Sequence, residues 1–347
     1  MPAMKKIHLV FFILVAFTFG ALLHEAPLFT APKNWPKPVY DLKKNPLSRA
    51  RINLGRVLFY DPILSRDSTI SCNSCHSQYT AFAHVDHALS HGIDNRIGTR
   101  NAPALMNLAW MSQFMWDGAI NHLDMQALAP MSNPLEMDEK IQHVVQKMQR
   151  TKIYPTLFYQ AFGDSAITGA RLLKSISQFM ITLVSSNSKY DSVMRHRAQF
   201  TTQELNGYQL FKKNCSACHT EPLYTNNTFQ SNGIPVDTSL HDFGRVTMSH
   251  ARTDSFLYKV PTLRNIEFSA PYMHDGRFKT LNAVLKHYTE GIDTTQIQSV
   301  TLKKRIHFNS NEKVDLIAFL ITLSDRQFLF DTSYSYPKKI LYNLAKD

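Results

Sequence analysis

The sequence predicts a mainly α-helical protein built from two similar units in tandem, with little β structure. Three observations support this prediction. A Cys-x-x-Cys-His motif occurs twice, at residues 72–76 and 215–219. Each copy follows a Gly-x-x-Leu-Phe segment with a helical apolar pattern, and a second helical segment closes each unit. A chain of 347 residues, of which 44% are hydrophobic, can also bury two modest cores.

The Cys-x-x-Cys-His motif is the attachment signal for c-type haem. Two thiols add to the vinyl groups of the haem, and the adjoining histidine is the proximal ligand of the iron. All four cysteines belong to the two motifs, which leaves none for disulfides. We therefore expect two covalently attached haem c groups, with a Cys-x-x-Cys zinc or thiol site as the alternative. The attachment residues are Cys72, Cys75 and His76 in the first motif and Cys215, Cys218 and His219 in the second.

Paired helices are expected around each motif. A glycine and an aromatic residue four apart share one helix face, so a second helix can cross closely over the glycine. These residues are Gly55 and Phe59 in the first unit, and Gly207 and Phe211 in the second. The first helix is expected to begin near Asn45-Pro46, and the crossing helices contain residues 179–183 and 319–323. Such a crossing is typical of cytochrome c, so we expect two cytochrome c-like haem domains.

The predicted domain organisation follows from these segments. Residues 1–26 contain a short basic region and an apolar run, which is a secretory signal pattern; an uncleaved N-terminal anchor is the alternative. Residues 27–190 form the predicted N-terminal haem domain, residues 191–330 the C-terminal haem domain, and residues 331–347 a tail. In both cases the folded part is exported, so we expect a periplasmic protein whose only membrane tether is its N-terminal segment.

Two segments lack a regular pattern. Residues 185–200 are polar and charged and are expected to link the two units. Residues 220–262 contain Asn, Gly, Pro and Asp at turn-forming density, which predicts a long irregular segment around the second haem.

The formal net charge of +11 results from 38 Lys and Arg against 27 Asp and Glu. A basic surface can steer an acidic partner, and the propionates of two haems would reduce the excess. No Lys/Arg cluster interleaved with aromatic residues is present, so we do not expect nucleic acid as a partner.

A third repeat distinguishes the two units. A Met-x-Asp-Gly motif occurs at residues 115–118 and 273–276, followed at the same offset by Pro130 in the first unit and Tyr288 in the second. In small cytochromes c, the sixth iron ligand comes from the segment after the haem motif. A phenol can ligate iron and a proline cannot, so the repeat predicts one open haem and one closed haem.

These motifs, in this order, resemble those of bacterial dihaem cytochrome c peroxidases over roughly residues 45–325. The matching segments are 55–59, 71–76, 100–103, 114–118, Pro130, 136–137, 260–265 and 270–276. Tyr288 makes the chain similar to the MauG-like branch of this family at the second haem. The classical peroxidases have methionine at the matching position. The resemblance implies that haem one, on His76, is the reaction centre for hydrogen peroxide.

The resemblance also implies roles for residues near haem one. Glu136 would be the acid/base and Gln126 its polar companion; the alternative for Glu136 is a solvated carboxylate at a helix entry. His91 matches the histidine that occupies the sixth position of haem one in the resting oxidised enzyme. A surface histidine is the alternative, because His84 and His87 are close in sequence. The segment from His91 to Arg100 is longer than in the peroxidases, which bears on this ligation switch.

At haem two, Tyr288 is the expected axial ligand, with His287 and Met273 as competitors and a core tyrosine on a helix over residues 281–288 as the alternative. Methionine raises the potential of a c-type haem, whereas a phenolate favours ferric or higher iron. Trp116 matches the indole that bridges electron transfer between the haems; buried aromatic packing is the other interpretation. An inter-haem calcium ion is implied, with Asn101, Ser269 and Pro271 as ligands.

The sequence therefore predicts an exported dihaem peroxidase that reduces hydrogen peroxide to water. The electrons come from a small cytochrome c or a cupredoxin. Two alternatives are a MauG-like oxidase that modifies an organic or protein substrate, and a dihaem electron-transfer protein without turnover. A homodimer is left open.

Overall fold

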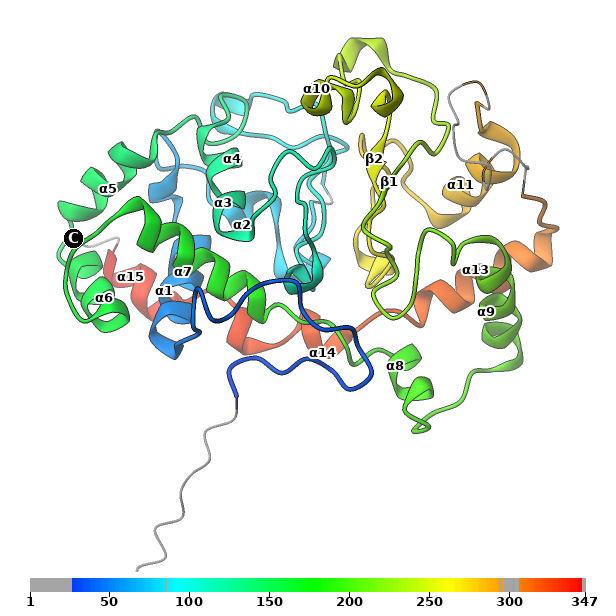
Figure 1. The fold of residues 1–347 in the computed structure, drawn as a ribbon, viewed down its shortest axis with the longest axis horizontal. Coiled ribbons are helices and arrows are strands. Elements are labelled where there is room, and N and C mark those ends of the chain that lie inside the picture. The colour runs from blue at the N-terminus through cyan, green and yellow to red at the C-terminus, as the bar shows by residue number, and fades with distance from the viewer. Residues whose placement is uncertain (1–26, 85, 294, 296–301, 303–305, 345–347) are drawn as a thin grey trace, which may run out of the picture.

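The computed structural model describes residues 27–84, 86–293, 295, 302 and 306–344, and the predicted N-terminal signal or anchor lies outside them. Figure 1 shows two predominantly helical halves side by side, with the C-terminal segment returning beneath the first half. The protein is mainly helical with little sheet, as predicted. Within the described part of the chain, no helix combines the length and the hydropathy needed to cross a bilayer.

The regular elements are short, and most of them are helical. The α-helices are α1 (Arg49–Tyr60), α2 (Cys72–Cys75), α3 (Leu123–Gln126), α4 (Leu128–Ser132), α5 (Ile141–Gln149), α6 (Ile153–Phe162), α7 (Gly169–Thr182), α8 (Lys189–Met194), α9 (Thr202–Asn214), α10 (Val246–Ser249), α11 (Leu281–Lys286), α13 (Ser310–Ile321), α14 (Arg326–Leu329) and α15 (Lys338–Leu344). A π-helix, η8 (His287–Gly291), follows α11 directly. The short 3₁₀ turns are η1 (Pro62–Leu64), η2 (Gln78–Thr80), η3 (Ile93–Asn95), η4 (Leu108–Trp110), η5 (Thr238–Leu240), η6 (Arg252–Asp254), η7 (Ile266–Phe268) and η10 (Thr332–Tyr334).

Each half contains the predicted pair of crossing helices. Helix α1 packs on α7, and α9 packs on α13. A Cβ atom on Gly55 would clash with the backbone carbonyl of Ser175, and one on Gly207 would clash with that of Asp315. Glycine is therefore required at both crossings because the partner backbone occupies the space of a side chain. Helix α1 begins at Arg49, not near Asn45-Pro46, because the Ser48 side chain caps it by accepting from the Arg51 N–H.

The backbone repeats in the two halves beyond these helices. Asn107 and Asn265 both adopt left-handed conformations and open the short turns η4 and η7. Their N–H groups donate to the carbonyls of Leu183 (2.8 Å) and Leu323 (3.1 Å), at the ends of the α7 and α13 regions. A single β-bridge joins residues 114 and 120, and another joins residues 272 and 278. The duplication predicted from sequence motifs is therefore present in the backbone itself.

The two halves contact each other through equivalent positions. The Asn101 N–H donates to the His274 carbonyl (2.7 Å), and the Lys259 N–H donates to the Trp116 carbonyl (2.7 Å). Asn101 and Lys259 occupy matching places in the two repeats, as do Trp116 and His274. Each half thus donates to the other through the same backbone group, as in a two-fold symmetric dimer interface.

The segment 185–200, predicted as a polar linker, contains helix α8 and packs into the second half. Tyr190 is buried in the second core. Asp191 forms a two-pronged ion pair with Arg264 (both 2.9 Å), and Arg264 is only 1% exposed. Sequence analysis missed this helix, although Ser188 and Asp191 form a capping box at its start; its buried partner Arg264 is distant in sequence.

The second segment without a regular sequence pattern contains only short elements, among them α10, η5 and η6. Residues 220–262 are largely irregular, with one antiparallel pair of two-residue strands, β1 (Phe229–Gln230) and β2 (Tyr258–Lys259). This pair forms the only β-sheet among the described residues.

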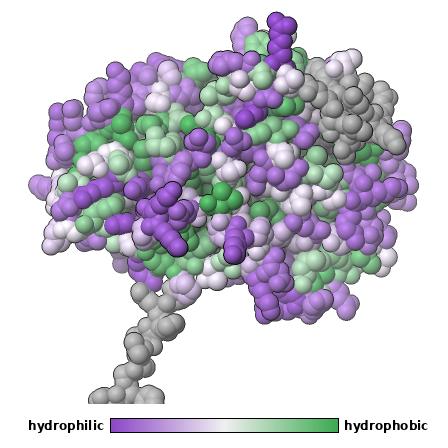
Figure 2. Space-filling model, viewed as in Figure 1, coloured by the Kyte–Doolittle hydropathy of each residue, from purple (hydrophilic) through white to green (hydrophobic). Residues whose placement is uncertain are grey.

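The C-terminal segment packs against the first half although it follows the second half in sequence. Phe328, Leu329 and Leu341 are buried in the core that contains α1 and α7. The Tyr334 hydroxyl donates to the Thr182 carbonyl (2.8 Å), and the Tyr60 hydroxyl donates to the Tyr334 carbonyl (2.8 Å). Figure 1 shows α15 beside α1. The outer face in Figure 2 carries dispersed polar residues with smaller apolar areas between them.

Candidate cofactor and active site

Both Cys-x-x-Cys-His motifs line one continuous cavity of about 430 Å³ between the two halves. Its walls are mostly apolar, and they include residues from the loops through which the two halves contact each other.

His76 is arranged as a metal ligand. Its Nδ1 lies 2.7 Å from the Phe82 carbonyl oxygen, and because a carbonyl can only accept, Nδ1 carries the proton. The lone pair of Nε2 is therefore free for iron. Burial lowers the pKa of His76 to about 4, so the imidazole is neutral, as ligation requires.

His219 has the same arrangement in the second half. Its Nδ1 lies 3.2 Å from the Tyr224 carbonyl and 3.1 Å from the Pro261 carbonyl. Burial lowers its pKa as well. Both histidines thus have their tautomer fixed by backbone carbonyls, which orients Nε2 as the available ligand atom.

The four cysteines are free thiols in apolar surroundings, which fits covalent haem attachment better than zinc or thiol chemistry. Burial raises the pKa of Cys72 and Cys215 to about 12 and that of Cys75 to about 11. Zinc ligands and reactive cysteines need thiolates, whereas a thioether carries no charge. Among the described residues, no group of three or more His, Cys, Asp or Glu side chains could hold a metal ion. The residues present therefore fit two haem c groups.

Glu136 lines the cavity near the first motif. Its charge contributes to the raised pKa of Cys75, which places the carboxylate close to that thiol. Burial raises the pKa of Glu136, and a hydrogen bond from Asn133 Nδ2 to Oε1 (2.8 Å) opposes the rise. The alternative of a helix-entry carboxylate does not apply, because Asn133 ends α4 and α5 begins only at Ile141.

Gln126 and Pro130 line the same cavity, from α3 and α4. The Gln126 amide Nε2 lies 3.9 Å from the Met115 sulfur. Glu136, Gln126 and Pro130 therefore all line the cavity that contains the first motif.

His91 does not line the cavity. Its ring stacks on His87 with centroids 4.2 Å apart, and His87 stacks on His84 at 5.7 Å. The backbone of the same segment nevertheless lies against the active-site wall: the Ile93 N–H donates to the Glu136 carbonyl (2.8 Å), and the Cys75 sulfur lies 3.6 Å from the His91 carbonyl. The structure therefore places His91 beside the first motif but directs its ring away from the cavity.

Tyr288 lines the cavity near the second motif. Burial, followed by the charges of Cys215 and Cys218, raises the pKa of its phenol. The helix expected over residues 281–288 differs in form, because α11 ends at Lys286 and Tyr288 lies on the π-helix η8. Single π-turns often occur at functional sites, since they redirect a side chain within a helix.

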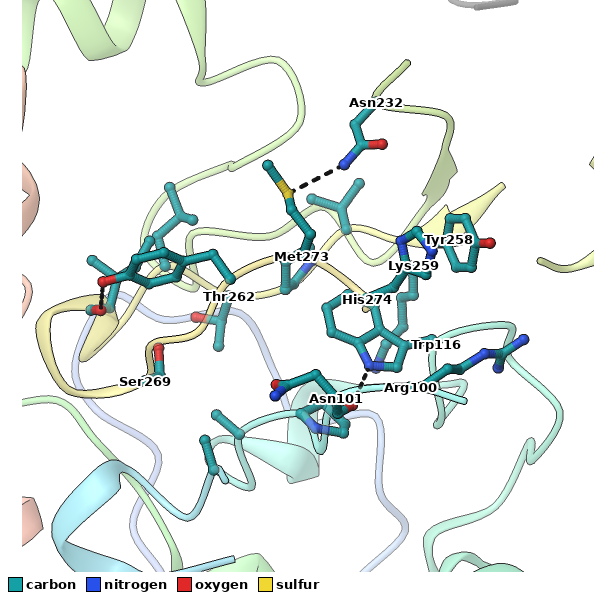
Figure 3. Close-up of a pocket in the computed structure, with 18 of the residues that line it drawn as sticks. Arg100, Asn101, Trp116, Asn232, Tyr258, Lys259, Thr262, Ser269, Met273 and His274 are labelled. Carbon is teal, nitrogen blue, oxygen red and sulfur yellow. Dashed lines mark hydrogen bonds between the residues drawn. The ribbon is translucent and has the colours of Figure 1, made fainter. Parts of the chain in front are cut away.

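The two competitors of Tyr288 are placed differently. Met273 lines the cavity, and its sulfur accepts from Asn232 Nδ2 at 3.3 Å (Figure 3). His287 does not line it; its Nε2 lies 2.9 Å from the Asn232 carbonyl and must donate. With Nε2 protonated and engaged, His287 is not arranged as a ligand.

Trp116 and Asn101 lie where the two halves meet, with Lys259 and His274 close by (Figure 3). The Trp116 Nε1–H donates to the Asn101 carbonyl (2.8 Å), which fixes the indole on the cavity wall. The side-chain Nδ2 of Asn101 donates to the Ala88 carbonyl (3.0 Å), so its Oδ1 is the atom available to a cation.

Ser269 and Pro271 line the same cavity as Asn101, so the structure brings the three predicted calcium ligands to one space.

Lys259 was missed by sequence analysis, because nothing in its neighbourhood marks a lysine as buried. His274 stood in a repeated motif without an assigned role; its ring stacks on Tyr258 at 3.7 Å.

Two haem-binding motifs in one doubled helical fold define a protein that carries two c-type haems. Comparison with known proteins agrees. The family model for di-haem cytochrome c peroxidase matches residues 49–199. MauG, a methylamine utilization protein of Methylorubrum extorquens, is 32% identical over 305 residues, covering 85% of this chain and 83% of MauG. The chain belongs to the di-haem cytochrome c peroxidase family.

Two further comparisons cover most of the chain. Cytochrome c551 peroxidase of Nitrosomonas europaea is 33% identical over 323 residues, covering 90% of this chain and 91% of that protein. The crystal structure of a MauG-like protein associated with microbial copper homeostasis superposes with a TM-score of 0.78 at 30% identity, covering 89% of this chain and 98% of that one. The similarity therefore extends over both halves.

Proposed function

We propose that this protein is a peroxidase that reduces hydrogen peroxide to water with two electrons from a small cytochrome c or cupredoxin. The observation that carries the proposal is the position of Glu136, a carboxyl group with a raised pKa facing the cavity beside the first motif. The cytochrome c peroxidase of Nitrosomonas europaea, similar over nearly its whole length, supports it.

The chain supplies the groups that such a reaction needs around the first haem, which when bound provides an iron that accepts electrons and binds peroxide. Asn133 holds Oε1 of Glu136, which leaves Oε2 as the oxygen that takes up and releases a proton. Gln126 adds a polar group to the same wall, where its amide can stabilise developing charge. Pro130 has no donor atom for iron and keeps the position open.

The second unit and the interface supply electrons in this proposal. Tyr288 would hold the iron of the second haem, and Trp116 would carry electrons between the two haems. Support comes from their shared cavity and from the hydrogen bond that fixes the indole to the Asn101 carbonyl. Residues 27–190 and 191–330 would each bind one haem as a cytochrome c-like domain, although Tyr190 packs in the second core and residues 328–329 pack in the first. His91 would be a ligand of the first iron only if its ring left the stack with His87.

A calcium ion held by Asn101, Ser269 and Pro271 belongs to the same proposal, supported by their common position at the cavity wall. We also place the protein in the periplasm, since its N-terminal sequence has the pattern of an export signal or anchor. A homodimer remains part of the hypothesis to be tested by solution mass.

A MauG-like oxidase is the second candidate, and Tyr288 is the observation that favours it. A phenolate stabilises oxidised iron and disfavours an easily reduced electron store. Steady peroxide consumption with a reduced cytochrome c or copper protein supports the peroxidase. Fast oxidation of both haems by peroxide, with poor turnover of these donors, supports the oxidase.

The test of the proposed acid/base is Glu136→Gln. This change keeps the shape of the side chain and removes its ability to exchange a proton, so peroxide turnover is expected to fall by about 10² to 10⁴-fold. Haem content, measured as the pyridine haemochrome, should stay normal. Glu139→Gln is the matched control, because Glu139 is paired with Lys147 and does not line the cavity. Unchanged turnover in Glu136→Gln would remove this residue from the mechanism.

A further inference from the structure

Lys259 carries a cation into the cavity without a carboxylate to neutralise it. The residue lies on β2, and its side chain faces the space between the two haem motifs. Its Nζ donates to the Gln113 carbonyl (3.2 Å) and lies 3.5 Å from the Met111 sulfur. These are weak, uncharged acceptors. Burial accordingly lowers the pKa of Lys259 to about 8.

The other cation of the cavity wall is already neutralised. Arg100 donates to Asp117 at 2.7 Å and, through two nitrogens, to Asp242 at 2.7 Å. Among the described residues that line the cavity, Arg100 and Lys259 are the only arginine and lysine. Within the described part of the chain, Lys259 therefore is the cation of this wall without an anionic partner.

A buried ammonium group is unfavourable unless an anion accompanies it. Its position is nevertheless held firmly: the Lys259 N–H donates to the Trp116 carbonyl (2.7 Å), and β2 pairs with β1. The matching position in the first half is Asn101, which is neutral. The repeat therefore places a lysine, instead of a neutral side chain, where the two halves meet (Figure 3).

We propose that Lys259 forms an ion pair with a propionate of one of the two haems, fixing that haem in the cavity and raising its reduction potential. Haem brings carboxylates to a lysine whose described side-chain contacts are a carbonyl and a thioether. A positive charge near the iron favours the reduced state, because reduction lowers the charge on the iron. The inference rests on the presence of haem and not on peroxidase activity.

The decisive variant is Lys259→Met, which keeps the length of the side chain and removes its charge. Spectroelectrochemical titration, with the two haems resolved by their absorption, measures the potential of each. For one haem, the equilibrium constant of reduction is expected to fall at least tenfold, which is 59 mV for one electron. Lys259→Arg should keep most of the wild-type potential. Lys174→Met, which removes an exposed lysine from α7, should change neither haem.

Unchanged potentials of both haems in Lys259→Met would overturn the proposal, whatever happens to turnover. If this variant fails to fold or to load haem, a crystal structure of the haem-loaded wild type decides. Lys259 Nζ within about 4 Å of a propionate oxygen supports the ion pair. Nζ on the Gln113 carbonyl alone, with the propionates elsewhere, refutes it. Peroxide turnover of the wild type is measured separately, so a failure of the proposed function leaves this test intact.

Discussion

At the residue scale, the two halves carry different side chains at three pairs of positions that match in the repeat. Pro130 corresponds to Tyr288, Trp116 to His274, and Asn101 to Lys259. The sequence repeat located the first two pairs, whereas the third pair and the hydrogen bonds became visible only in the fold. A shared backbone with unlike side chains is a simple way to give two haems different chemistry, since ligand type and nearby charge set the potential.

Tyr288→Met tests the ligand of the second haem. Methionine ligation raises the potential of a c-type haem, so the second haem should become easier to reduce, while the first changes little. Redox titration followed by absorption spectroscopy checks this. His287→Phe is the control, because His287 donates to the Asn232 carbonyl and lies outside the cavity wall. An unaltered potential in Tyr288→Met would mean that a different group is bound to that iron.

At the element scale, the two pairs of crossing helices could be predicted from the sequence, whereas other helices could not. The Gly-x-x-Leu-Phe pattern predicts a close crossing, because a glycine on an apolar helix face lets a second helix approach closely. Helix α8, despite its Ser188–Asp191 capping box, and the π-helix η8 were not predicted. Their stability depends on groups distant in sequence, such as Arg264 for Asp191 and the cavity wall for Tyr288. Local pattern carries no trace of such partners.

Gly207→Ala should destabilise the second half by about 1 to 3 kcal/mol, because the new methyl group would meet the Asp315 backbone at the crossing of α9 and α13. In an unobstructed helix the same change is stabilising, so the sign itself is diagnostic. Denaturant unfolding measures the difference in free energy. The neighbouring change Asn206→Ala, at an exposed position, is the control. A gain in stability for Gly207→Ala would show that the helices do not cross here.

Asp191→Asn should cost about 3 to 5 kcal/mol of unfolding free energy, because it leaves the buried guanidinium of Arg264 unpaired. Burial alone would raise the pKa of Asp191, but the hydrogen bonds and charge of Arg264 outweigh it and hold the pKa below 3.8. The ionised pair therefore stabilises the fold above pH 3.8, and this contribution is lost as the pH falls through the lowered pKa. Asp164→Asn, in an exposed pair with Arg171, should have no measurable effect.

At the scale of the whole molecule, the first core includes residues from both ends of the described chain. The first core takes residues from α1, α6 and α7, and then from α14 and α15, after the entire second half has been made. Length and composition were enough to predict two cores, but they could not show that the last segment belongs to the first of them. The link is made by residues more than one hundred and fifty positions apart, such as Tyr334, whose hydroxyl donates to the Thr182 carbonyl.

Phe328→Ala should destabilise the first half by about 3 to 5 kcal/mol, because Phe328 is 3% exposed in its core. Hydrogen exchange resolved by segment should show faster opening of α1 and α7, with α9 and α13 nearly unaffected. Phe330→Ala is the matched control, since Phe330 is 59% exposed. Faster exchange confined to α9 and α13 would assign the C-terminal segment to the other core.

The return of the C-terminal segment has a consequence for biosynthesis. A ribosome delivers α1 and the first Cys-x-x-Cys-His motif long before α14 and α15 exist. Until the end of the chain emerges, the earliest core lacks Phe328, Leu329 and Leu341. Completion of this core therefore waits for the last residues to be synthesised.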